Sequence, residues 1–105
     1  MTRERILTTL PTGGVAITCP AEEFIGLLLF HRLAAGRREA IEFIAERDCR
    51  HLGTAIAIVD VDEIPTDRTH RNAWRRSANG GPIWICETAA QAIDEQRMWD
   101  AYERT

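Results

Sequence analysis

Residues 54–61 read Thr-Ala-Ile-Ala-Ile-Val-Asp-Val, and this segment decides the fold. The run is apolar, rich in β-branched side chains and too short for a typical helix, which favours a strand. Because nearly every position is apolar, we expect the strand to occupy a central place in a sheet.

Two strands and two helices are predicted before this strand. Residues 5–10 and 15–19 are predicted as short strands, and the Pro-Thr-Gly-Gly turn between them predicts a β-hairpin. A helix is expected from Pro20 to about Ala35, ending at Gly36. A second helix is expected over residues 37–52, with one apolar stripe and charged pairs on its outer face.

The first predicted helix is apolar on most sides between Phe24 and Leu33. Such a helix is either deeply buried or presents a face to a partner. We therefore expect that this segment could form the interface of a homodimer.

After the central strand, residues 62–81 are irregular and residues 82–86 are predicted as another strand. Thr88 and Gln91 match a capping box that opens a C-terminal helix. The order ββααβ–loop–βα predicts a single α+β domain over residues 1–105, with a small, mostly antiparallel sheet and helices packed on one face.

Composition excludes several functions. The chain has 105 residues, a net charge of −3 and thirteen basic residues, all of them arginine. The absence of lysine excludes a P-loop lysine, a Schiff base and a lysine-dependent nuclease centre. The acidic balance makes direct nucleic-acid binding an unfavoured function. Three separated cysteines, no signal-peptide core and no long apolar run predict a cytoplasmic protein without a membrane span.

The most distinctive segment is DVDEIPTDRTHRNAWRR, residues 60–76. Three acids open it, and four arginines around a histidine and a tryptophan follow. Arginine and tryptophan are common in binding hot spots, so the segment predicts a partner-binding site; internal ion pairing is the alternative. With a later tryptophan, the candidate residues are Asp60, Asp62, Glu63, Asp67, Arg68, His70, Arg71, Trp74, Arg75, Arg76 and Trp84.

Trp84 alternates with Ile83 and Ile85 in the predicted strand. If the isoleucines enter the core, Trp84 faces the opposite side, either open to a partner or covered by a helix.

No catalytic or metal site is predicted, and no cofactor. Asp60 and Asp62, with Glu63 or Asp67, could hold a hard cation such as Mg²⁺, but their spacing matches no metal motif. Cys49 and His51 would need further ligands for zinc, with no supporting spacing. We therefore expect a protein that is not an enzyme.

The stretch from Ile64 to Trp74, I-P-T-D-R-T-H-R-N-A-W, resembles a signature of small phage and prophage proteins that typically reads I/L-P-x-D-R-T-F-R-x-A-W. Here His70 stands where that family has phenylalanine, and residues 82–87 differ from its V-V-D-M-x-K-A-like continuation. The resemblance implies an origin in a mobile element. It implies no activity, cofactor or catalytic residue.

Three functions follow from these features. The first is a phage-encoded, non-enzymatic inhibitor of a bacterial defence system, of the anti-CRISPR type, which blocks a surface of its target complex with a local acidic patch. The second is a virion or tail-assembly accessory protein. The third is a metal-dependent nuclease using Asp60, Asp62 and Asp67. The acidic patch of the proposed inhibitor would consist of Asp60, Asp62 and Glu63, or of Glu87, Asp94 and Glu95.

Overall fold

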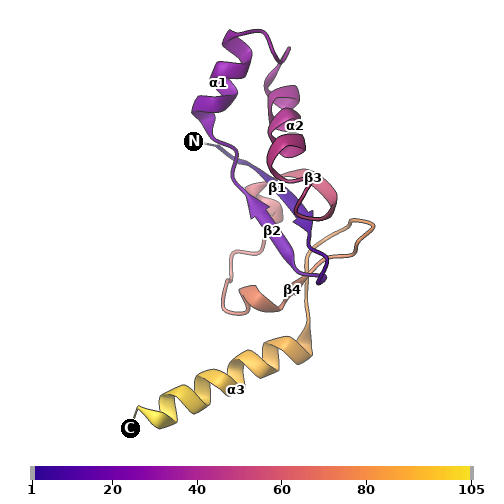
Figure 1. The fold of residues 1–105 in the computed structure, drawn as a ribbon. Coiled ribbons are helices and arrows are strands. Elements are labelled where there is room, and N and C mark those ends of the chain that lie inside the picture. Colours follow the sequence, from indigo (N-terminus) through magenta and orange to yellow (C-terminus); the bar gives the residue numbers. More distant parts are fainter. Residues whose placement is uncertain (1, 105) are drawn as a thin grey trace.

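A computed structural model describes residues 2–104 as a small sheet, a helical hairpin, a long loop and a projecting helix (Figure 1). The elements follow the predicted order, and the α+β class is confirmed. Their bounds are β1 Glu4–Thr9, β2 Val15–Thr18, α1 Glu22–Phe30, α2 Arg37–Asp48, β3 Thr54–Asp60, the short helical turns η1 Val61–Glu63 and η2 Arg71–Ala73, β4 Trp74–Arg75, β5 Trp84–Ile85 and α3 Glu87–Glu103.

The main sheet is antiparallel with the order β2-β1-β3, so the central strand is β1. The prediction that residues 54–61 form a central strand is wrong, because β3 pairs only with β1 and forms an edge. Its apolar run has another cause: Ile56 and Ile58 pack on one face of the sheet and Val59 on the other. An apolar run therefore indicates cover on both faces and does not fix the place of a strand in its sheet.

Helices α1 and α2 cover one face of the sheet. Ile6 of β1 contacts a cluster that includes Ile25 and Leu28 of α1 and Ile41 and Ile44 of α2. The inward residues of α1 and of α2 are three apart, the spacing that places side chains on one helix face. The main core of the domain lies here.

The loop after β3 covers the other face. Leu7 and Val15 of the hairpin form a second cluster with Ile64 and Trp74, against which Ile83 packs. The loop from η1 to β5 thus takes the place that a third helix would have in a three-layer fold.

The first helix ends earlier than predicted, at Phe30. Arg32 has a left-handed backbone with φ of 57°, and the N–H of Leu33 donates to the carbonyl oxygen of Leu28 at 2.9 Å. This is the geometry of a Schellman cap, formed here by arginine instead of the usual glycine. Gly36, the expected breaker, is instead the residue before α2.

Helix α3 does not pack on the sheet. It leaves β5 at the far end from α1 and projects outward, with only its first turns beside η2 (Figure 1). The chain measures 58 × 30 × 22 Å and has a radius of gyration of 17.0 Å, where a compact domain of this length has about 13 Å. The prediction that the helices pack on one face therefore holds for α1 and α2 only.

The start of α3 also differs from the prediction. The helix begins at Glu87 after Cys86, whose side chain makes no capping bond, so the Thr88 capping box is wrong. The N–H of Cys86 instead donates to the carbonyl oxygen of Ala73 at 2.8 Å, which ties the helix start to η2. Within residues 2–104, no helix combines the length and the apolar character needed to cross a membrane.

Candidate partner-binding surfaces

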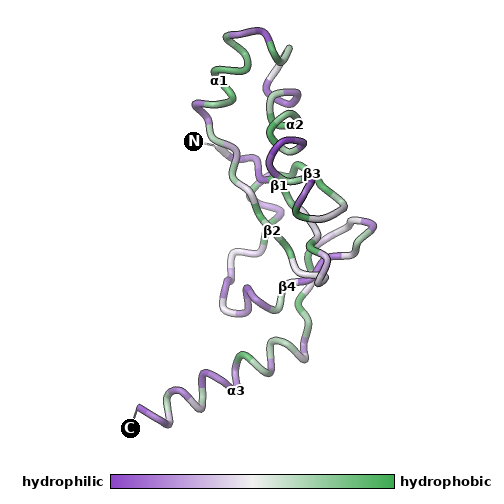
Figure 2. Tube along the Cα trace, in the orientation of Figure 1, coloured by the Kyte–Doolittle hydropathy of each residue, from purple (hydrophilic) through white to green (hydrophobic). Residues whose placement is uncertain are grey.

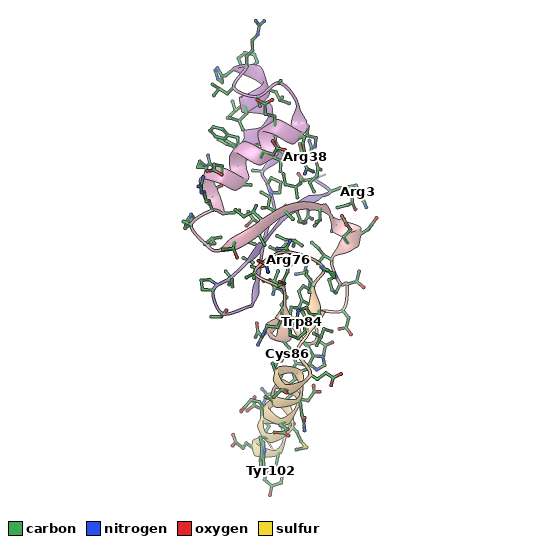
Figure 3. The ribbon with its side chains drawn as sticks, turned by 90° about the vertical axis from the view of Figure 1, so that its right-hand side faces the viewer. Arg3, Arg38, Arg76, Trp84, Cys86 and Tyr102 are labelled. Atoms are coloured by element: carbon green, nitrogen blue, oxygen red, sulfur yellow. The ribbon has the colours of Figure 1, made fainter. Side chains whose placement is uncertain are left out.

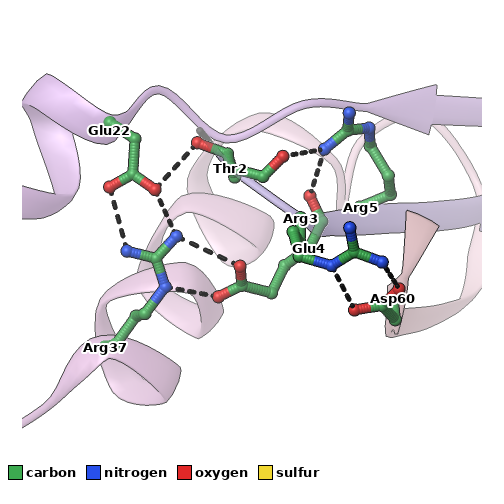
Figure 4. Close-up of polar contacts among 7 residues, drawn as sticks. All are labelled: Thr2, Arg3, Glu4, Arg5, Glu22, Arg37 and Asp60. Atoms are coloured by element: carbon green, nitrogen blue, oxygen red, sulfur yellow. Dashed lines mark hydrogen bonds and ion pairs between the residues drawn. The ribbon is translucent and has the colours of Figure 1, made fainter. Parts of the chain in front are cut away.

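Arg3 pairs with two acids at the end of β3, of which Figure 4 shows Asp60. Nη2 of Arg3 lies 3.0 Å from Oδ1 of Asp60 and 2.7 Å from Oδ2 of Asp62. Asp60 also accepts the N–H of Asp62, and Glu63 accepts the N–H of Asp60, both at 2.9 Å. The N–H of Asp62 and the Arg3 guanidinium together lower the pKa of Asp60. These acids terminate the strand and offer a partner less negative charge than their number suggests.

A second arginine links three elements. Arg37, in the first turn of α2, donates to Glu4 of β1 through Nε at 2.5 Å and to Glu22 of α1 through Nη1 at 2.9 Å (Figure 4). Its hydrogen bonds, with a further one from Thr2, lower the pKa of Glu22 to about 2, and they lower the pKa of Glu4 as well. The network links both helices of the hairpin, α1 and α2, to strand β1 of the sheet.

This network predicts a pH-dependent stability. Because the pKa of Glu22 is depressed in the fold, its contribution is complete above pH about 4.5 and is lost as pH falls towards 2. We expect Arg37→Gln to be less stable than the wild type near neutral pH, with a difference that shrinks through this window. Urea denaturation followed by circular dichroism at decreasing pH measures it. Arg38→Gln, which removes a longer exposed pair with Glu42, is the control; an Arg37→Gln difference that does not change with pH would contradict the prediction.

Residues 67–70, in the middle of the predicted site, hold α3 in place. Asp67 accepts the N–H and the hydroxyl of Thr69, at 2.9 and 2.6 Å, and these bonds lower its pKa. Arg97 of α3 donates to the carbonyl oxygen of Thr69 at 2.6 Å. Nε2 of His70 lies 2.7 Å from Oδ1 of Asp94, also on α3. These contacts connect the loop to the middle of the helix.

Trp74 and Arg71 form the inner side of the loop. Trp74 is 1% exposed and is the largest side chain of the second cluster. The guanidinium carbon of Arg71 lies 4.7 Å from the Trp74 ring centroid, and its Nη2 donates to the carbonyl oxygen of Val15 at 3.1 Å. Burial lowers the pKa of Arg71. Both residues hold the loop against β2.

Arg76 has the same role at the other end of the loop, where it is 5% exposed (Figure 3). Its guanidinium donates to the carbonyl oxygen of Gly81 at 2.8 Å, to the hydroxyl of Thr9 at 3.1 Å and to the carbonyl oxygen of Ala55. Burial lowers its pKa. Neighbouring Arg75 donates to the backbone of its own loop. Trp74 and Arg76 could touch a partner only if the loop opened.

Arg68 and Trp84 are the predicted residues with most freedom to meet a partner. Arg68 is exposed beside a hollow of about 220 Å³ that Arg5 and Ile17 also line. Trp84 is 54% exposed opposite Arg75 in the β4–β5 ribbon, while Ile83 turns inward as expected. Ile85 is 46% exposed, so the expectation that both isoleucines enter the core is wrong for Ile85, and both residues of β5 are exposed.

The chain brings no metal-ligand cluster together within residues 2–104: no three His, Cys, Asp or Glu side chains are placed to share an ion. Asp60 and Asp62 pair with Arg3, and Asp67 accepts a hydrogen bond from the Thr69 hydroxyl within its own turn. Cys49 is buried and donates to the hydroxyl of Thr18 at 3.4 Å, as a packed free thiol does.

Three exposed side chains on α3 were not predicted as site residues: Met98, Trp99 and Tyr102. They line an open apolar hollow of about 370 Å³, and the Trp99 and Tyr102 rings meet edge to face at 6.0 Å. Trp99 is 56% exposed. The available signal was a tryptophan and a tyrosine three residues apart in a helix, which places them side by side.

No protein-family model, curated protein or solved structure matches this chain. The signature over residues 64–74 and the mobile-element origin that it implies therefore stay predictions.

Proposed function

We propose that this chain is a non-enzymatic binding protein that docks onto other proteins through α3. One observation carries the proposal: α3 runs for 17 residues without a buried residue and ends in the apolar group Met98, Trp99 and Tyr102. Aromatic residues and methionine are enriched at protein interfaces. Most helical stability in proteins comes from packing of an apolar face, so a partner that covers this group would also stabilise the helix.

The setting that we favour is an accessory role in the assembly of a phage particle. The resemblance over residues 64–74 suggests a mobile-element origin. The elongated body supports an assembly role, because α3 and the exposed apolar end of α1 lie at opposite ends of the molecule (Figures 1 and 2). A protein with one docking surface at each end can connect two neighbours.

A second candidate is the defence inhibitor of the anti-CRISPR type. It is favoured by the charge of α3, where Glu87, Asp94 and Glu95 are exposed and residues 87–104 carry five acids against two arginines. Such a helix could occupy a basic channel of a target complex. The other acidic group considered, Asp60 with Asp62 and Glu63, is less suited because Arg3 pairs with it.

The test is co-purification of the tagged protein from host cells in which the mobile element is active. We expect a stoichiometric protein partner with the wild type and its loss with Met98→Ser/Trp99→Ser. Trp84→Ala is the matched control, since it also removes an exposed tryptophan. Loss with Trp84→Ala and retention with the α3 variant would overturn the docking role of α3 and favour the loop.

Phage structural proteins as the partner would support assembly. A defence effector complex would support inhibition. Turnover of a nucleic acid or another substrate by the purified protein would contradict the non-enzymatic proposal.

A further inference from the structure

Strand β3 is an open edge of the main sheet. In an antiparallel ladder, alternate residues direct their backbone groups toward the paired strand and away from it. The N–H of Val61 donates to the carbonyl oxygen of Arg3 at 2.8 Å, and this bond fixes which residues face β1. The N–H and C=O of Ile58 and the C=O of Ile56 therefore point away from β1, and among residues 2–104 they have no hydrogen-bond partner. These groups are free to pair with another extended backbone.

The opposite edge of the sheet, β2, is approached by the protein's own loop. The carbonyl oxygen of Gly13 accepts the N–H of Arg76 at 3.0 Å, and that of Val15 accepts Nη2 of Arg71 at 3.1 Å. The loop after β3 thus lies against the start of β2 and restricts the approach of another strand there.

The sequence of β3 does not protect its edge with charge or proline, as natural proteins commonly do. All residues from Ala55 to Val59 are apolar. Ile56, Ile58 and Val59 are only partly buried, although they pack against the two core clusters. The free row stops at Asp60, whose N–H is already accepted by the Glu63 carboxylate. The open edge is therefore short, apolar on both faces and closed at its end.

Two hollows flank this edge. The first, of about 480 Å³, lies between α2 and β3 and touches Ile56, Ala57 and Ile58 in succession, so it follows the strand edge. The second, of about 410 Å³, lies on the loop side and is lined by Val59 and Ile83 among others. Side chains of a strand point alternately to the two faces of its sheet. A strand that pairs with β3 would therefore fill both hollows, and it should be apolar on both sides.

The β3 strand of a second copy meets each of these requirements. It is extended, is apolar on both faces and carries the same free backbone groups. In a two-fold antiparallel pair, Ile56 of each copy lies opposite Ile58 of the other. The N–H of each Ile58 then meets the free C=O of the opposite Ile56. The edge is thus complementary to itself.

The charges along α2 also agree with a two-fold contact. Helix α2 stands above β3 in Figure 3, and Arg38 in its first half and Glu46 in its second half line the first hollow. A two-fold axis makes the two α2 helices antiparallel, which brings the Arg38 end of each toward the Glu46 end of the other. Both residues have exposed partners in α2, Glu42 and Arg50, so the rim is neutral and like charges do not oppose the contact.

From these observations we infer that two copies of this chain pair edge to edge through β3. The two three-stranded sheets would form one six-stranded antiparallel sheet of order β2-β1-β3-β3-β1-β2. The same surface of both copies is used, so the contact closes on itself and the product is a dimer, not a filament. The inference does not depend on the docking proposed for α3, which projects away from this sheet (Figure 1).

A cysteine at the two-fold axis tests this contact. In the pairing, Ala57 of one copy lies directly opposite Ala57 of the other, at a spacing that a disulfide can span. In a Cys19→Ser/Cys86→Ser background, we expect diamide to convert Ala57→Cys into a covalent dimer on a non-reducing gel. Val59→Cys is the matched control, because its two copies lie about 13 Å apart along the strands and cannot join. Cys49 is buried and stays in both variants.

Ile58→Pro tests the free backbone group. Proline removes the N–H that points away from β1 and leaves the β1–β3 ladder intact, as edge strands tolerate. Ile58→Ala is the control, since it also shortens the side chain but keeps the N–H. By analytical ultracentrifugation, we expect the wild type to shift from monomer to dimer with rising concentration. Ile58→Pro should associate at least about tenfold more weakly than Ile58→Ala, and circular dichroism checks the fold of each variant.

A variant in α3 keeps this contact apart from the proposed function. Met98→Ser/Trp99→Ser should dimerise as the wild type does, and loss of its dimer would overturn the inference. So would a wild type that stays monomeric at millimolar concentration, equal cross-linking of the two cysteine variants, or equal association of Ile58→Pro and Ile58→Ala. If the α3 variant keeps the dimer and also keeps every foreign partner, the β3 contact stands and only the proposed function fails.

Discussion

Trp74→Ala is expected to lower the free energy of unfolding by about 3–5 kcal/mol, the range for removal of a large aromatic side chain from a core. Trp74 is the largest side chain in the cluster that joins the loop to the hairpin, and no other aromatic residue belongs to that cluster. Its loss leaves a cavity and also removes the ring on which Arg71 stacks. Guanidinium denaturation followed by far-UV circular dichroism measures the change.

Trp84→Ala is the matched control, because it makes the same chemical change at a half-exposed position. We expect it to cost less than about 1 kcal/mol. Equal losses for the two variants would contradict the two-face arrangement of the sheet.

Trp74→Ala also bears on the docking role of α3. Trp74 pairs with Ile85 in the β4–β5 ribbon, and the helix begins two residues later. A loosened loop would no longer hold the helix start through Ala73. We therefore expect weaker partner binding from a residue that no partner touches, in contrast to Trp99, whose replacement should weaken binding without a comparable loss of stability.

The order of elements was predictable from the sequence because it depends on local patterns. The glycine turn between β1 and β2 and the apolar spacing of α2 are each visible within a few residues. The end of α1 was not predictable from the sequence, because Arg32 adopts a left-handed backbone conformation that is usual for glycine.

The role of the arginine cluster could not be decided locally. Arg76 bonds to Thr9 and Ala55, which lie 67 and 21 residues away in the chain. Its function follows from where backbone carbonyl oxygens meet after folding. The sequence left binding and internal pairing open; the structure gives Arg71 and Arg76 internal contacts and leaves Arg68 exposed.

The position of α3 was missed for a different reason. A helix with a tryptophan and a tyrosine is ordinarily expected to pack on a sheet face. Here α1 and α2 already cover one face and the loop with Trp74 covers the other. The sequence did not show that the loop would cover the second face of the sheet. It therefore could not show that both faces would already be covered and that α3 would have no sheet face to pack on.

Gly53→Ala is the second change with a large expected effect, a loss of about 3 kcal/mol or more, at or above the usual cost of overpacking. A Cβ on Gly53 would lie 1.9 Å from the carbonyl oxygen of Thr9 and 2.8 Å from its carbonyl carbon. These are backbone atoms of the central strand, so no side-chain rotation can relieve the clash. The close approach falls where the β1–β3 register shifts, between Leu7 and Thr9.

Gly26→Ala separates this clash from the general effect of adding a methyl group. Gly26 lies within α1, and a Cβ there meets nothing within 4 Å. Alanine is the better helix former, so this variant should gain about 1 kcal/mol. Urea denaturation of both variants is the measurement. If Gly53→Ala kept wild-type stability, the close approach of Gly53 to Thr9 would be wrong, and with it the shifted β1–β3 register at that point.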